Sequence, residues 1–137
     1  MSFSEIYSIS EFGLDVERTR LKAAALNIAN QNTIYDHNSI KNNRNIGSVE
    51  VSSRPTFIDT LNKTANITYY YDGNLRSVYK PEHAAADQNG MIHMPKIDIS
   101  QQMITLTSAE RAYDANVKVI NTIYSMAQKT MELGNNR

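Results

Sequence analysis

The sequence predicts a mainly α-helical protein with a small β part. Long N- and C-terminal helices are expected to pair as an antiparallel coiled coil, with a β-hairpin-containing middle segment between them. Apolar residues recur at helical spacing at both ends of the chain, glycine and proline are absent from Ser108 to Leu133, and the middle is rich in tyrosine and turn residues. We therefore divide the chain into residues 1–33, 34–97 and 98–137.

Composition excludes several kinds of function. The 137 residues suit one domain, and 14 basic residues balance 14 acidic ones, so clustered charge gives no reason to expect nucleic acid or an anionic membrane. Cysteine is absent, which excludes a disulfide framework and thiolate chemistry. The N-terminus shows no basic stretch followed by an apolar one, so we expect no cleavable secretion signal. No apolar run approaches the ~20 residues that span a bilayer.

The first predicted helix runs from about Ser4 to Asn30. Its apolar positions recur every seven residues, at Tyr7, Leu14, Leu21 and Ile28. Gly13 interrupts this pattern as a possible weak point, because glycine costs about 1 kcal/mol relative to alanine inside a helix.

The middle of the chain is expected to contain a loop followed by short strands. Residues 31–47 are rich in asparagine and show no periodicity, which indicates a surface loop. Between Ser48 and Pro95 the β-rich runs are short. The dipeptide Asp72-Gly73 stands between two of them and predicts a β-hairpin, because both residues tolerate positive φ.

The second helix is predicted from about Asp98 to Leu133, with Asp98 or Ser100 as its N-cap and Gly134 as its C-cap. Its apolar residues follow an a/d heptad pattern. One series is Ile99, Leu106, Tyr113, Ile120 and Ala127, and the other is Met103, Val117, Tyr124 and Met131. A helix of about 34 residues is ~50 Å long, which exceeds any compact core that this chain can build.

A further stripe on the same helix consists of Ala112, Val119, Met126 and Leu133, again seven residues apart. An ordinary coiled coil within one chain explains one stripe, whereas two stripes on different faces favour assembly with other subunits. We hypothesise that one stripe packs on the Leu14–Leu21–Ile28 face of the same chain and that Ala112, Val119, Met126 and Leu133 pack on neighbouring subunits. The intrachain stripe comprises Met103, Leu106, Tyr113, Val117, Ile120 and Tyr124.

Candidate chemistry is sparse. His37, His83 and His93 are scattered without i,i+4 pairing, so solvated loop histidines are favoured over a metal site. We identify no nucleotide-binding or nucleophile motif and expect no catalytic residue, cofactor or small-molecule substrate. The tyrosines at 69–71 could stack on bases, but strand packing is favoured because basic residues are not adjacent.

Three segments of the chain contain recognisable motifs. "RLKAAALNIANQNT", through Arg20, Leu21, Ala25, Asn27, Ile28, Ala29 and Asn30, resembles the N-terminal signature of one protein family, the axial proteins of the bacterial flagellar rod and hook. "RAYDAN" resembles its C-terminal signature through Arg111, Tyr113, Ala115 and Asn116. "VYKPEHAAADQNGMIHMPKIDI" resembles a stretch typical of the proximal rod through Tyr79, Pro81, His83, Ala86, Asp87, Asn89, Gly90, Pro95 and Asp98. The departures from these patterns are Leu26, Ala84 and Met91.

The resemblance implies a structural subunit of the axial rod, which crosses the periplasm. Its implied partners are other copies of itself, other rod proteins and the flagellar type III export apparatus. Asn27, Asn30 and Asn116 lie close to apolar faces, so we expect them to form hydrogen bonds at helix junctions. A sibling subunit of the proximal or distal rod is the nearest alternative, against which residues 79–98 argue. From another class, the alternative is a helical coiled-coil adaptor or binding module.

Overall fold

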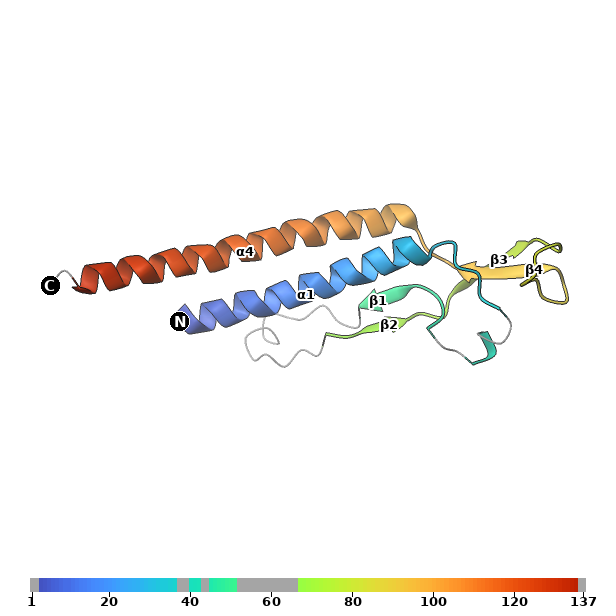
Figure 1. The fold of residues 1–137 in the computed structure, drawn as a ribbon, viewed down its shortest axis with the longest axis horizontal. Helices are drawn as coiled ribbons and strands as arrows, with labels where there is room; N and C mark the ends of the chain where they lie inside the picture. Colours follow the sequence, from blue (N-terminus) through green and yellow to red (C-terminus); the bar gives the residue numbers. More distant parts are fainter. Residues whose placement is uncertain (1–2, 37–39, 43–44, 52–66, 136–137) are drawn as a thin grey trace.

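The molecule is built on two long helices that lie side by side and run antiparallel (Figure 1). The computed structural model describes residues 3–36, 40–42, 45–51 and 67–135. Helix α1 spans Phe3–Asn30 and helix α4 spans Ile99–Asn135. The C-terminal end of α1 lies beside the start of α4 (Figure 1). The predicted mainly α-helical fold, with paired terminal helices and a small β part, is confirmed.

The two ends of α4 differ in how they are formed. The Asp98 carboxylate accepts hydrogen bonds from the N–H groups of Ser100, at 2.9 Å, and Gln101, at 3.2 Å, so Asp98 is the N-cap. At the other end the predicted C-cap is wrong, because the helix continues through Gly134 to Asn135 and Gly134 does not adopt positive φ. A cap glycine usually turns the chain onto a tertiary contact, and nothing lies within 4 Å of the Cβ position at Gly134.

Small residues bring the two helices close together. Ala24 on α1 and Ala109 on α4 are 1% and 0% exposed. A Cβ at Gly13 would lie 2.8 Å from the side-chain nitrogen of Asn116 and 3.2 Å from its Cγ. The glycine that the sequence marked as a weak point is therefore the place where a side chain of α4 meets the backbone of α1.

Two small antiparallel sheets make up the β part. Strand β1 (Val49–Val51) pairs with β2 (Tyr69–Tyr71) beside α1, and β3 (Leu75–Tyr79) pairs with β4 (Met91–Pro95). The β3–β4 pair extends beyond the end of the helix pair (Figure 1).

The predicted hairpin at Asp72-Gly73 is wrong, because β2 and β3 belong to different sheets. Gly73 does adopt positive φ, at 72°. However, the Asp72 carboxylate accepts hydrogen bonds from the N–H of Ser48, at 2.8 Å, and from its hydroxyl, at 2.9 Å. These bonds hold β2 beside β1, so a contact distant in sequence replaces the local hairpin. The hairpin that forms instead joins β3 and β4 through residues 80–90.

The β part has a small core of its own. Ile92 and Pro95 on β4 are fully buried, and Ile46 is 4% exposed. The loop after α1 joins this core where the N–H of Tyr35 donates to the carbonyl of His93 at 2.9 Å. The predicted Asn-rich loop is thus anchored to β4 at one of its described positions.

The Gly13 contact predicts unequal effects of the same substitution at two helical glycines. Gly13→Ala should raise the free energy of unfolding by less than Gly134→Ala does, because the new methyl group must displace the Asn116 side-chain amide and this offsets the gain of about 1 kcal/mol in helix propensity. Gly134→Ala should raise it by up to about 1 kcal/mol, since it adds helix propensity in open space. Thermal unfolding followed by circular dichroism measures both, and equal gains would contradict the close approach.

The Asp72 anchor predicts acid sensitivity of the β part. Partial burial disfavours its ionised form, but hydrogen bonds from Asn74 and Ser48 outweigh burial and hold the pKa of Asp72 below its ordinary 3.8. A carboxyl with a lowered folded-state pKa stabilises the fold above its unfolded pKa, and this stability is lost as pH falls through the folded value.

We therefore expect unfolding free energy to fall below about pH 4 and this fall to be smaller in Asp72→Asn. Asp15→Asn is the control, because Asp15 forms an exposed ion pair with Arg18 on α1. Urea unfolding at stepped pH is the measurement. An identical acid response in Asp72→Asn and the parent protein would rule out this anchor as its source.

Candidate assembly site

Asn27 joins three elements at the end of the helix pair where the β part begins. Its side chain is 2% exposed, and its amide nitrogen donates to the carbonyl of Val49 at 2.9 Å while its oxygen accepts from the Val49 N–H at 2.6 Å. The same nitrogen donates to the Gln102 side-chain oxygen on α4 at 3.0 Å. A side-chain amide carries the same donor and acceptor as a peptide group, so Asn27 completes the hydrogen bonding of β1 as a neighbouring strand would.

The other two asparagines of the family signatures have different surroundings. Asn30 ends α1, where its side-chain oxygen lies 3.4 Å from the Thr33 hydroxyl and its carbonyl accepts from the Thr33 N–H at 2.9 Å. Asn116 is partly buried against Gly13. Of the three, Asn27 alone is fully buried.

The remaining signature residues are spread over several faces of the helices. Leu21, Ile28 and Tyr113 are partly buried, whereas Ala29, Arg111 and Ala115 are exposed.

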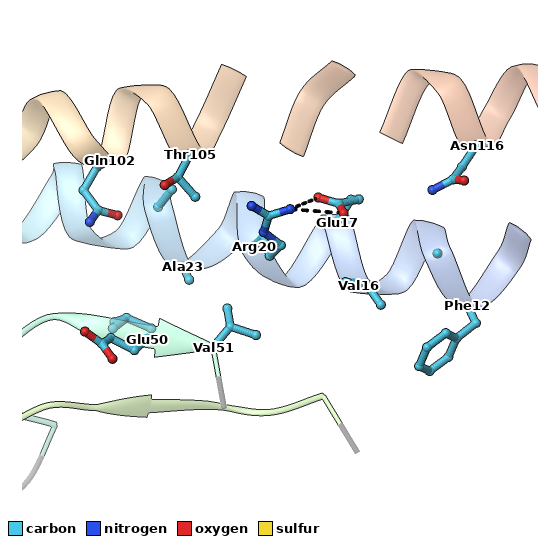
Figure 2. Close-up of a pocket in the computed structure, with 13 residues that line it drawn as sticks. Phe12, Val16, Glu17, Arg20, Ala23, Glu50, Val51, Gln102, Thr105 and Asn116 are labelled. Carbon is cyan, nitrogen blue, oxygen red and sulfur yellow. Dashed lines mark hydrogen bonds and ion pairs between the residues drawn. The ribbon is translucent and has the colours of Figure 1, made fainter. Parts of the chain in front are cut away.

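A cleft of about 580 Å³ lies along α1, between β1 and α4 (Figure 2). Phe12, Val16 and Ala23 extend from α1 on the side away from α4 (Figure 2). Toward α4, Arg20 and Glu17 form an ion pair with N–O distances of 2.9 and 3.2 Å, and their side chains are 27% and 13% exposed. The cleft thus has an apolar wall on α1 and a polar wall toward α4, and the exposed Glu50 of β1 lines it as well. We call it the α1 cleft.

The stripe assigned to neighbouring subunits becomes more exposed toward the C-terminus. Ala112 is partly buried, Val119 is 42% exposed, Met126 is 54% exposed and Leu133 is 75% exposed. Among the residues that the structure describes, no element covers most of that stripe.

The residues assigned to intrachain packing differ in their exposure. Leu14, Leu106, Val117 and Ile120 are partly buried, as is Tyr113. Met103 and Tyr124, however, are 54% and 67% exposed, so their assignment to the helix contact needs correction. Ala109 and Ile123 are the buried positions of α4 instead, because the contact is narrow and centred on small side chains.

The segment before α4 forms the tip of the β3–β4 hairpin. Gly90 has a φ of 74°, and a Cβ there would lie 3.0 Å from both Pro81 and Tyr79. The Asp87 carboxylate accepts from the N–H groups of Met91, at 2.9 Å, and Asn89, at 2.8 Å, and the Met91 bond is the largest cause of its lowered pKa. The residues of this motif therefore form a tight loop.

At the end of this motif, Pro95 is buried and Asp98 caps α4. Four other motif residues are exposed, namely Tyr79, Pro81, His83 and Asn89.

The histidines take part in local hydrogen bonds. His93 lies 3.0 Å from the Ser77 hydroxyl and 3.4 Å from the Asp87 carboxylate, and His83 accepts from the N–H of Ala85 at 3.1 Å. His37 lies outside the described residues. Within the described ranges, no group of three or more His, Asp or Glu side chains is arranged to hold a metal ion.

Neither long helix, over its described residues, combines the length and apolar character needed to cross a membrane.

Comparisons with known proteins agree with this architecture. The family described as the flagellar basal body rod FlgEFG protein C-terminal matches residues 88–133. The flagellar basal-body rod protein FlgC of Salmonella typhimurium is 31% identical over 134 residues, which cover 98% of this chain and 99% of the relative. The FlgC proteins of Agrobacterium fabrum and Bacillus subtilis are 30% and 26% identical, over 91% and 93% of this chain and 90% and 95% of theirs.

Paired terminal helices, a small β part and these similarities define a structural, non-enzymatic subunit of the flagellar basal-body rod, which spans the periplasm. The chain belongs to the family of the rod protein FlgC. Membership implies that it assembles with other rod proteins. The sibling rod protein and the helical adaptor are therefore set aside.

Sequence reasoning missed two residues of the helix junction. Gln102 has no apolar periodicity to mark it, and its role depends on Asn27, 75 residues away. Gly13 was noticed only for its cost to helix formation. A glycine inside a helix that is otherwise well formed was the available signal for a close approach.

The Asn27 geometry predicts a large and specific loss of stability. Asn27→Ala leaves the buried N–H and carbonyl of Val49 without partners and should lower the free energy of unfolding by about 2–3 kcal/mol. Asn30→Ala is the matched control and should cost no more than about 0.5 kcal/mol, because its side-chain bond is long and exposed. Denaturant unfolding compares the two, and equal losses would contradict the junction role of Asn27.

Proposed function

We propose that this rod subunit joins its neighbours through the stripe of Ala112, Val119, Met126 and Leu133. The terminal segments, 1–33 and 98–137, then form the main assembling part of the subunit, and residues 34–97 form its small middle segment. Asn27 and Asn116 set the register of the helices at their junction, whereas the side-chain oxygen of Asn30 lies near the Thr33 hydroxyl at the end of α1. The neighbours are other copies of this chain and other rod proteins.

The observation that carries this proposal is the exposure of α4 beyond the reach of α1. The helices have 37 and 28 residues, so α4 is longer by nine residues or ~13 Å. Because Asn116 faces Gly13 in an antiparallel pair, Phe3 at the start of α1 lies level with Met126. The helix beyond Met126 extends past the end of α1 (Figure 1). Met131 and Leu133, both 75% exposed, lie on this extension, which suits burial in an assembly.

We further propose that the flagellar type III export apparatus delivers the chain to the periplasm. The support is the family membership. Helix α1 begins at Phe3 and carries the signature residues from Leu21 to Asn30. The N-terminal part of the exported chain is therefore also part of the helix pair.

The stripe is tested by placing a charge on it. Met126→Glu should leave the unfolding temperature of the purified chain nearly unchanged, because Met126 is already 54% exposed, and should abolish rod assembly and swimming. Ser125→Glu adds the same charge at the adjacent exposed position and should assemble. Basal-body imaging and motility assays in cells lacking the parental gene distinguish the variants. Normal rods formed by Met126→Glu would overturn the proposed interface.

A further inference from the structure

Two surfaces of this chain carry accessible apolar side chains and lie too far apart to cover each other. One is the α1 cleft, whose apolar wall includes Phe12, Val16 and Ala23. The other is the last part of α4, residues 126–134, which we call the α4 tail. Figure 1 shows that α4 continues past the start of α1. The cleft begins only at Phe12, so within one chain the tail extends away from it.

We propose that the α4 tail of one copy occupies the α1 cleft of a second copy of this chain. The inference rests on the proposed function and makes it more specific, because it names the receiving surface and the partner. It concerns a head-to-tail contact, in which the two copies contribute different surfaces.

The dimensions of the two surfaces agree. The cleft follows α1 from Phe12 to Ala24, which is ~18 Å of helix, and the stretch from Met126 to Leu133 is ~11 Å long. Met126 and Leu133, seven residues apart on one face of the tail, would lie against the apolar wall, with Leu133 beside Phe12 and Val16. The apolar side chains of the tail are 54–75% exposed at Met126, Met131 and Leu133, so their burial supplies the driving force for docking.

Symmetry also favours the α4 tail of a second copy as the occupant of the α1 cleft. A contact between different surfaces of identical chains repeats without closing whenever the rotation between copies leaves a translation, and it then builds open helical filaments. A rod needs contacts of this kind. A tail-to-tail contact would instead use the same surface on both copies and would close into an isolated pair.

The polar wall determines on which side of the cleft an apolar tail can lie. Glu17 and Arg20 are held to one another on the α4 side of the cleft, with Asn116 close to Gly13. An apolar tail is therefore expected to settle on the Phe12–Val16 side, where it displaces no ion pair. This places the tail of the second copy beside α1 and β1 rather than between α1 and α4.

Engineered cysteines test the contact, because the chain has none of its own. Val16→Cys and Leu133→Cys are combined in one chain that replaces the parental copy in flagellated cells, and isolated basal bodies are oxidised mildly. We expect a covalent product at twice the 15.5 kDa chain mass. Val16 lies level with Tyr113, about 30 Å from Leu133 along α4, so a disulfide within one chain is excluded.

Glu11→Cys with Leu133→Cys is the matched control, because Glu11 is exposed on the opposite side of α1 from the cleft. The product should be lost in this control. Phe12→Cys with Leu133→Cys provides a second cleft position if Val16→Cys does not swim under reducing conditions. No product from either cleft pair, a dimer from Leu133→Cys alone, or a cross-link from the tail to a different rod protein would each overturn the inference.

The same experiment separates this inference from the proposed function. If Met126→Glu blocks rod assembly and the cleft pairs give no product, the stripe remains an interface and the cleft is not its partner. If Met126→Glu forms normal rods, the proposed function fails, and the docking that rests on it fails as well.

Discussion

The rest of the structure depends on the hydrogen bonds of the buried Asn27 amide. Its two groups match the N–H and carbonyl of Val49, and the remaining donor reaches Gln102 on α4. A two-stranded sheet is marginal by itself. Here β1 gains the equivalent of a third strand from a helix, and the position of the sheet is fixed relative to both long helices. The Asn27 side chain therefore links the helical part to the β part.

The helix pair is narrow because small residues form its contact. Ala24, Ala109 and Gly13 allow the backbones to approach. Larger apolar side chains of α4 differ in exposure, since Ile123 is buried while Met103 and Tyr124 are 54% and 67% exposed.

Periodicity was sufficient to predict both helices and their pairing, since α1 and α4 differ from the expected bounds by one or two residues. The β part was not predictable in the same way, because the partner of β2 depends on the bond between Asp72 and Ser48 rather than on the turn sequence. Heptad counting also placed Met103 and Tyr124 in the helix contact. It detects apolar faces but not the distance between helices, which Gly13 and Asn116 set here.

The extension of α4 past α1 has a consequence for the dynamics of the free subunit. Local opening of a helix is opposed chiefly by tertiary contacts, so backbone amides near Ala109 are protected by α1 while those after Met126 are protected by helix formation alone. Hydrogen exchange along α4 should therefore become steadily faster toward its C-terminus. In the free subunit, the backbone of α4 is therefore expected to be less ordered toward its C-terminus. This is the end that the proposed interface would cover.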